Sequence, residues 1–98
     1  MAWRIKILPA VRGVINGLWA SGALSRAGWI HVQTALYFQL PTRARRLQSA
    51  RYAMDPDCFV YEVRFYEHGV WHRFNFFVND SLSPGLLSVQ DTEYKSHR

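Results

Sequence analysis

The sequence predicts a single α+β domain, residues 1–98, with the order β-α-α-β-β-β and two helices packed on one face of a small antiparallel sheet. Three observations predict it. The first residues alternate apolar and charged side chains, residues 9–40 hold two stretches with helical spacing, and residues 58–90 read as three successive strands. A chain of 98 residues fits one hydrophobic core.

The N-terminal strand is expected over residues 3–7, where the alternation has the period of two that a half-buried strand shows. Pro9 follows, and proline fits the first turn of a helix because its missing N–H is no loss there. The helix should end at the Ser21-Gly22 pair. Its apolar stripe is Val11, Val14, Ile15, Leu18 and Trp19.

A second helix is expected to begin after Ser25, a capping residue, and to stop at Pro41. Residues 42–57 show no clear period and end in an Asp-Pro-Asp turn signal. This connector is strongly basic, so we interpret it as a candidate nucleic-acid-binding strip or as an ordinary solvated linker. Its basic residues are Arg43, Arg45, Arg46 and Arg51.

A β-hairpin is predicted with the dipeptide His68-Gly69 at its tip, between strands 58–67 and 70–79. A two-residue loop fixes the register, so Glu67 should pair with Val70 and every further pair follows. One face is then apolar and should pack against Val14, Leu18 and Trp19 of the first helix. Its members are Phe59, Tyr61, Val63, Phe65, His72, Phe74, Phe76 and Val78. A third, shorter strand is expected over residues 86–90.

The other hairpin face places Arg64 opposite Arg73, a repulsive pair that a diagonal Glu62 can partly compensate. Beside them Tyr66 lies opposite Trp71, and flat rings of this kind stack on nucleobases. Two arginines with a carboxylate suit a phosphodiester whose charge grows in a transition state. We therefore expect catalytic residues at Arg64, Arg73 and Glu62 and nucleic-acid contacts at the two aromatics. The alternatives are a solvated face or a protein interface.

Charge is unevenly distributed along the chain. Residues 1–54 hold eight basic residues and no acid, a net charge of +8. Residues 55–98 hold four basic and seven acidic residues, a net charge of −3, which gives the total of +5. This asymmetry favours an anionic partner for the first half, either a nucleic acid or an acidic protein segment.

Several functional classes lack their usual signals. No apolar run reaches the ~18–20 residues of a membrane span, so no membrane association is expected. The single cysteine, Cys58, permits no internal disulfide, which suits the reducing cytoplasm. No group of His, Cys and carboxylates has metal-site spacing, and no glycine-rich phosphate loop is present. We expect neither a metal nor another cofactor.

The order of elements resembles the RelE/ParE toxin superfamily. Residues 3–12 are similar to its usual start, a strand that enters a helix through a Pro-Ala-basic pattern. Residues 58–64 and 73–78 resemble its central hairpin. Leu87-Ser88-Val89, followed by Tyr94-Lys95, looks like its last strand and the tail after it. The resemblance covers nearly the whole chain in architecture.

This resemblance implies a toxin of a toxin–antitoxin system. Members similar to RelE cut messenger RNA at the ribosome without a metal, using basic residues on the sheet, a tail tyrosine and the RNA's own 2′-hydroxyl. Arg73 matches the arginine of the second hairpin strand, and Tyr94 matches the tail tyrosine. The chain departs from the family at Val60 and Glu62, where the family carries lysines. RNA or the ribosome and an acidic antitoxin are the implied partners.

The alternative is a non-catalytic binding module. It would be a gyrase-inhibiting toxin similar to ParE, or a small interaction or adaptor protein that forms a homodimer. Both would use the hairpin face or the basic connector to bind a protein, so the sequence leaves open whether the chain is an enzyme.

Overall fold

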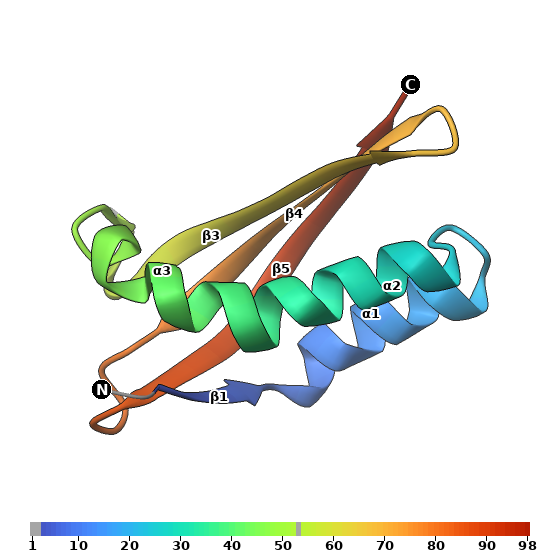
Figure 1. Ribbon diagram of the computed structural model, residues 1–98. Helices are drawn as coiled ribbons and strands as arrows, with labels where there is room; N and C mark the ends of the chain where they lie inside the picture. The colour runs from blue at the N-terminus through green and yellow to red at the C-terminus, as the bar shows by residue number, and fades with distance from the viewer. Residues whose placement is uncertain (1–2, 53) are drawn as a thin grey trace.

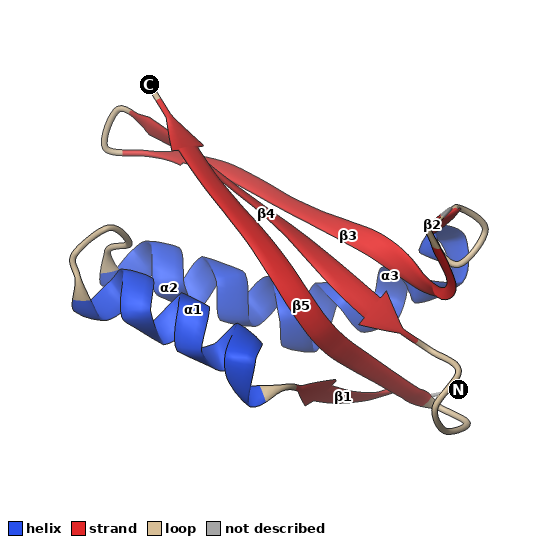
Figure 2. Cartoon of the chain, turned by 180° about the vertical axis from the view of Figure 1, so that it is seen from behind, coloured by secondary structure: helices blue, strands red, loops and turns tan. Residues whose placement is uncertain are grey.

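The structure, a computed structural model, describes residues 3–52 and 54–98, and in it helices cover one face of a five-stranded sheet (Figure 1). The strand order is β1-β5-β4-β3-β2. Figure 2 shows the opposite face of the sheet turned toward the viewer, with the helices behind it. The strands are β1 (Arg4–Ile7), β2 (Arg51–Tyr52), β3 (Asp55–Glu67), β4 (Val70–Asn79) and β5 (Leu86–His97). The predicted α+β class is confirmed.

The sheet is mixed rather than purely antiparallel. β1 runs parallel to β5, with Ile5 beside Leu87 and Ile7 beside Val89, whereas β2 to β5 pair antiparallel. After β1 the chain forms the helices and then enters the sheet at the opposite edge with β2. The strands β3, β4 and β5 follow side by side, so β5 lies next to β1. The expected order β-α-α-β-β-β fits, with the two-residue β2 added before the hairpin.

Both helix starts are confirmed. α1 (Pro9–Ala20) has Pro9 in its first turn, and at α2 (Arg26–Thr34) the Ser25 side chain accepts a hydrogen bond of 3.1 Å from the Gly28 N–H. The stop expected at Pro41 is wrong. The chain continues through a π-helical turn, η1 (Ala35–Gln39), into α3 (Leu40–Leu47). The Leu40 N–H bonds back to the Ala35 carbonyl, so the wider turn ends where proline has no N–H to offer.

The hairpin register is confirmed at all ten pairs, from Cys58 with Asn79 to Glu67 with Val70. The turn residues His68 and Gly69 both have positive φ, 51° and 77°, which is the geometry of a type I′ turn and matches the right-handed twist of the strands. Phe74 and Phe76 are fully buried, whereas Arg73 is exposed and Asn75 between the two rings is half-buried. The face assignment is therefore correct.

The core lies between the helices and the covered face of the sheet, and α1 meets it by a different side than expected. Val11 and Ile15 are buried, whereas Val14 and Trp19 are exposed at 39% and 44%. Trp19 instead stacks on Trp29 of α2, with ring centroids 4.6 Å apart. The expected contact of Val14 and Trp19 with the hairpin is wrong, because the second helical segment occupies that space. It contributes Val32, Leu36, Leu40 and Ala44 to the core.

The last strand is longer than expected, because β5 continues to His97 rather than ending near residue 90. The strand contains a β-bulge at Gln90: Val78 pairs with Val89 and Phe77 pairs with Asp91, so Gln90 is the extra residue. The bulge reverses which residues point to the core. None of the described helices is long and apolar enough to cross a membrane.

Candidate nucleic-acid interface

The face of the sheet opposite the helices, here called the open face, carries its side chains in cross-strand rows. Each row takes one residue from β3, one from β4 and one from β5. Directly paired side chains have Cβ atoms about 4.5–5.5 Å apart, so each row is a contiguous surface. The rows are an end row (Val60, Phe77, Asp91), an acidic row (Glu62, Asn75, Glu93), a basic row (Arg64, Arg73, Lys95) and an aromatic row (Tyr66, Trp71, His97).

The basic row brings three cations side by side, which is one more than sequence reasoning identified. The Arg73 Nε lies 3.1 Å from the Glu62 Oε2, so the expected diagonal compensation is confirmed. Within the described parts of the chain, Arg64 and Lys95 form no ion pair. Like charges at directly paired positions cost stability, and the row therefore keeps positive charge available for an external anion.

The aromatic row borders the basic row. Tyr66 and Trp71 contact edge to face, with centroids 5.3 Å apart, and their exposed fractions are 59% and 37%. The Arg64 guanidinium lies over the Trp71 ring, 5.7 Å from its centroid. Exposed rings beside cations provide both a stacking surface and phosphate contacts. Tyr66, Trp71, Arg64 and Arg73 thus lie together as the sequence predicted.

Tyr94 does not lie with them. It belongs to β5 rather than to a tail, and it points to the helix side of the sheet, where it packs on Phe74 with centroids 4.7 Å apart. Its hydroxyl is 2.7 Å from the His72 Nδ1. The bulge at Gln90 causes this. Because Gln90 is an extra residue, the alternation of side chains between the two faces shifts by one residue after it, and Tyr94 faces the helices. The four expected catalytic residues are therefore split, with Glu62, Arg64 and Arg73 on one face and Tyr94 on the other.

The basic connector is also separate from the open face. Arg43, Arg45 and Arg46 are exposed on α3, which lies in the helix layer (Figure 2). Arg51 binds Asp80 through two hydrogen bonds of 2.6 and 2.9 Å, and this contact holds the pKa of Asp80 below its usual value. Arg51 therefore forms an ion pair with Asp80, and its side chain stays 37% exposed. The connector and the aromatic pair do not form one strip.

A cleft that sequence reasoning missed lies between the α1–α2 loop and the far end of the sheet, with a volume of about 370 Å³. Ser25, Glu67, His68, His72 and Tyr94 contribute polar groups to it. The Ser25 hydroxyl donates to Glu67. Burial lowers the pKa of His72, and the Glu67 carboxylate opposes that effect. The only sequence signal was the cap residue Ser25, which gave no reason to connect it with Glu67.

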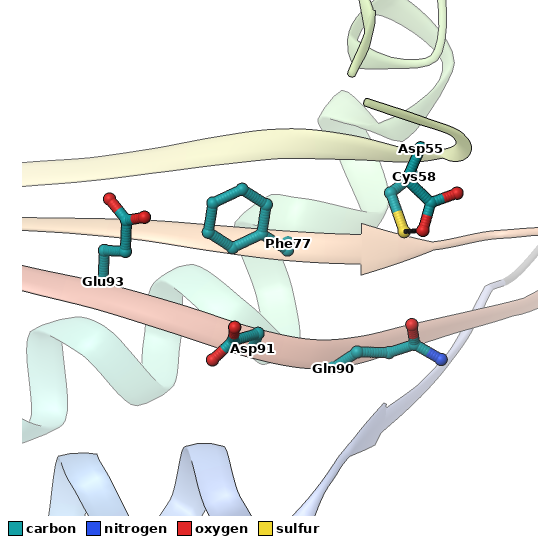
Figure 3. Close-up of a pocket in the computed structure, with 6 residues that line it drawn as sticks. All are labelled: Asp55, Cys58, Phe77, Gln90, Asp91 and Glu93. Carbon is teal, nitrogen blue, oxygen red and sulfur yellow. Dashed lines mark hydrogen bonds between the residues drawn. The ribbon is translucent and has the colours of Figure 1, made fainter. Parts of the chain in front are cut away.

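A second pocket, of about 290 Å³, lies at the opposite end of the open face and is acidic (Figure 3). Asp55, Asp91 and Glu93 line it together with the buried thiol of Cys58. The thiol donates to the Asp55 carboxylate at 3.4 Å. Burial is the largest cause and that hydrogen bond the next largest of an increase in the pKa of Cys58 to about 11. A thiol held protonated in this way is a poor nucleophile.

Cys58 is expected to resist alkylation. With a folded pKa of about 11 against an ordinary value of 9.0, its thiolate fraction at pH 8 falls about 100-fold. Because the pKa of Cys58 is higher in the folded state, the protonated thiol contributes all of its stabilisation of the fold below about pH 9. This contribution is lost as the pH rises toward 11. Mass spectrometry of iodoacetamide labelling, native against urea-unfolded, measures the rate ratio. Native labelling within threefold of the unfolded rate contradicts the assignment.

Comparison of the chain with protein-family models, with curated proteins and with solved structures found no match. The open face itself therefore carries the functional argument. Its basic row can neutralise phosphates, its aromatic row can stack on bases, and the Glu62 carboxylate lies within reach of a group bound at Arg73.

Proposed function

We propose that the protein binds single-stranded RNA across its open face. The observation that carries this proposal is the basic row lying directly beside the aromatic row. Two residues along a strand separate neighbouring rows by about 6.6 Å, so one nucleotide can reach both. Its phosphate contacts Arg64 or Lys95, and its base stacks on Tyr66 or Trp71. Each stacked base contributes about 1–3 kcal/mol.

The exposure of the aromatic rings favours a single strand over a duplex. Tyr66 at 59% and Trp71 at 37% offer ring surface on which an unstacked base can lie, whereas the bases of a duplex are already stacked on one another. Reading a duplex instead requires an element that enters a groove, and this face is a sheet flanked by an acidic row. The positive first half of the chain adds long-range attraction for the RNA without a specific contact.

The resemblance to the RelE/ParE superfamily extends the proposal to a cytoplasmic toxin, with RNA or the ribosome as target and an acidic antitoxin as partner. The helix layer supports the second part. Residues 3–52 contain no carboxylate side chain, and Ile30 and Phe38 are exposed there at 46% and 72%. A segment with acidic and apolar side chains complements such a surface.

Cleavage of the bound RNA is the second candidate function, and the Glu62–Arg73 contact of 3.1 Å favours it. Glu62 would accept the proton of the 2′-hydroxyl as that oxygen attacks the adjacent phosphorus. Arg64 and Arg73 would neutralise the charge that develops on the phosphate oxygens. The bond to the 5′-oxygen then breaks, which leaves a cyclic phosphate and, after that oxygen takes a proton, a 5′-hydroxyl. Tyr94 has no place in this site.

A Trp71→Ala protein is expected to bind a fluorescent oligouridylate about tenfold more weakly than the wild type, because one stacking surface is lost. Trp19→Ala is the matched control, since Trp19 is exposed to a similar degree but lies on the helix layer. Fluorescence anisotropy, with an RNA duplex in parallel, measures the affinities. Equal affinity for the duplex and the single strand, or an equal loss in the Trp19→Ala protein, rules the proposal out.

The same mixtures test the second candidate when the RNA is analysed by mass spectrometry. Products ending in a cyclic phosphate that disappear with Glu62→Gln, while binding persists, support cleavage. Intact RNA in the presence of bound wild-type protein excludes it and leaves the binding function standing.

A further inference from the structure

We propose that the open face also binds a second copy of this chain, and that the resulting dimer masks the RNA-binding rows. Only the masking of the RNA-binding rows rests on the proposed function. The dimer itself is argued from the order of the rows, which runs end row, acidic row, basic row, aromatic row along the strands.

The rows are complementary to their own reversed order. A two-fold axis that lies between two facing sheets, parallel to the rows and midway between the acidic and basic rows, reverses the row order and keeps each strand over its counterpart. The acidic row of one copy then covers the basic row of the other. Glu62 meets Arg64 of the second copy, and Glu93 meets Lys95 of the second copy.

The outer rows match in the same arrangement. The end row covers the aromatic row, so Val60 meets Tyr66 of the second copy and Phe77 meets Trp71 of the second copy. Asp91 meets His97 in the same way. Apolar side chains thus face aromatic rings, and carboxylates face cationic or titratable groups. The other face-to-face arrangement, with the axis along the strands, would place the basic row on the basic row and is repulsive.

The size of the patch determines how strong the dimer can be. Four rows span about 20 Å along the strands and three strands span about 10 Å between outer strand axes. This is a smaller surface than the roughly 800 Å² per partner that stable interfaces bury. We therefore expect a reversible, concentration-dependent dimer and a monomer at low concentration. Since the basic and aromatic rows are covered in the dimer, only the monomer binds RNA.

Two charge-reversed proteins test the dimer. One reverses the acidic row (Glu62→Lys, Glu93→Lys), and the other reverses the basic row (Arg64→Glu, Lys95→Glu). Each alone should dimerise at least tenfold more weakly than the wild type, because like rows now face each other. An equimolar mixture should restore the dimer as a heterodimer, since both row contacts become attractive. Sedimentation equilibrium over a range of concentrations measures all four samples.

Three results overturn the dimer: a wild type that stays monomeric at every concentration, variants that dimerise as well as the wild type, or a mixture that stays monomeric. Circular dichroism confirms that the variants are folded. The milder pair Glu93→Lys and Lys95→Glu, both on β5, repeats the mixing test with a single substitution in each protein, should a double variant not fold.

Masking is tested separately by adding excess oligouridylate to the wild-type dimer. We expect RNA-bound monomer in sedimentation, and an apparent RNA affinity that falls as the protein concentration passes through the dimerisation range. A dimer that retains bound RNA overturns masking. A dimer that never binds RNA overturns the proposed function while the dimer stands, and RNA binding by a permanent monomer overturns the dimer alone.

Discussion

A Phe74→Ala protein is expected to lose about 3–5 kcal/mol of its free energy of unfolding, the cost of truncating a fully buried phenylalanine. Phe74 lies in the middle of β4. Its ring centroid is 5.5 Å from that of Phe76, on which it stacks, and 4.7 Å from that of Tyr94. Domains of this size are stabilised by only about 5–15 kcal/mol, so the loss removes a large share. Urea unfolding followed by circular dichroism measures it.

Phe38→Ala is the matched control, because Phe38 is also a phenylalanine but is 72% exposed on the helix layer. Its free energy of unfolding should stay within about 0.5 kcal/mol of the wild type. A Phe74→Ala protein that is destabilised by less than 1 kcal/mol would show that the hairpin face toward the helices is not the core, and with it the placement of the open face would fail.

Reversing two charges of the basic row, Arg64→Glu with Lys95→Glu, is expected to reduce affinity for oligouridylate more than 100-fold at low salt. Two cations that face the phosphates become two anions, and both lie within one row. Each phosphate contact that is lost should also lower the slope of log affinity against log salt by about 0.7, so two contacts lower it by about 1.4. Titrations at several salt concentrations measure both quantities.

Arg45→Glu with Arg46→Glu provides the control, because it changes the net charge by the same amount on α3. The loss there should be below tenfold, since those arginines act on the RNA only through the general field. Equal losses in the two proteins would mean that the RNA responds to net charge rather than to the open face. A larger loss at α3 would move the binding surface to the helix layer.

The hairpin was predictable because local chemistry determines it. A two-residue turn at His68-Gly69 leaves one register, and alternation then assigns every side chain from Phe59 to Val78 to a face. The ion pair between Glu62 and Arg73 followed from that register, as did the contact of Tyr66 with Trp71. The open face was therefore largely visible in the sequence.

Features that depend on distant packing were not predictable. Pro41 is a helix stop by local rules, but a π-helical turn over residues 35–39 carries the helix past it. The polar residues of the second half of β5 have no apolar stripe, so nothing local marked them as a strand. Local rules therefore do not identify Lys95 as the third member of the basic row, and they place Tyr94 beside arginines from which the sheet separates it.

The bulge at Gln90 divides β5 into two halves whose side chains alternate between the faces in opposite phase. Upstream of it odd-numbered residues such as Val89 face the core, and downstream even-numbered ones such as Tyr94 do. If β5 continued from Val89 in regular alternation without the bulge, Lys95 would point toward the helices and Tyr94 toward solvent. Deleting Gln90 itself would keep both side chains on their present faces, because Asp91 already pairs with Phe77. Lys95 therefore reaches the basic row because β5 accommodates one unpaired residue before Asp91.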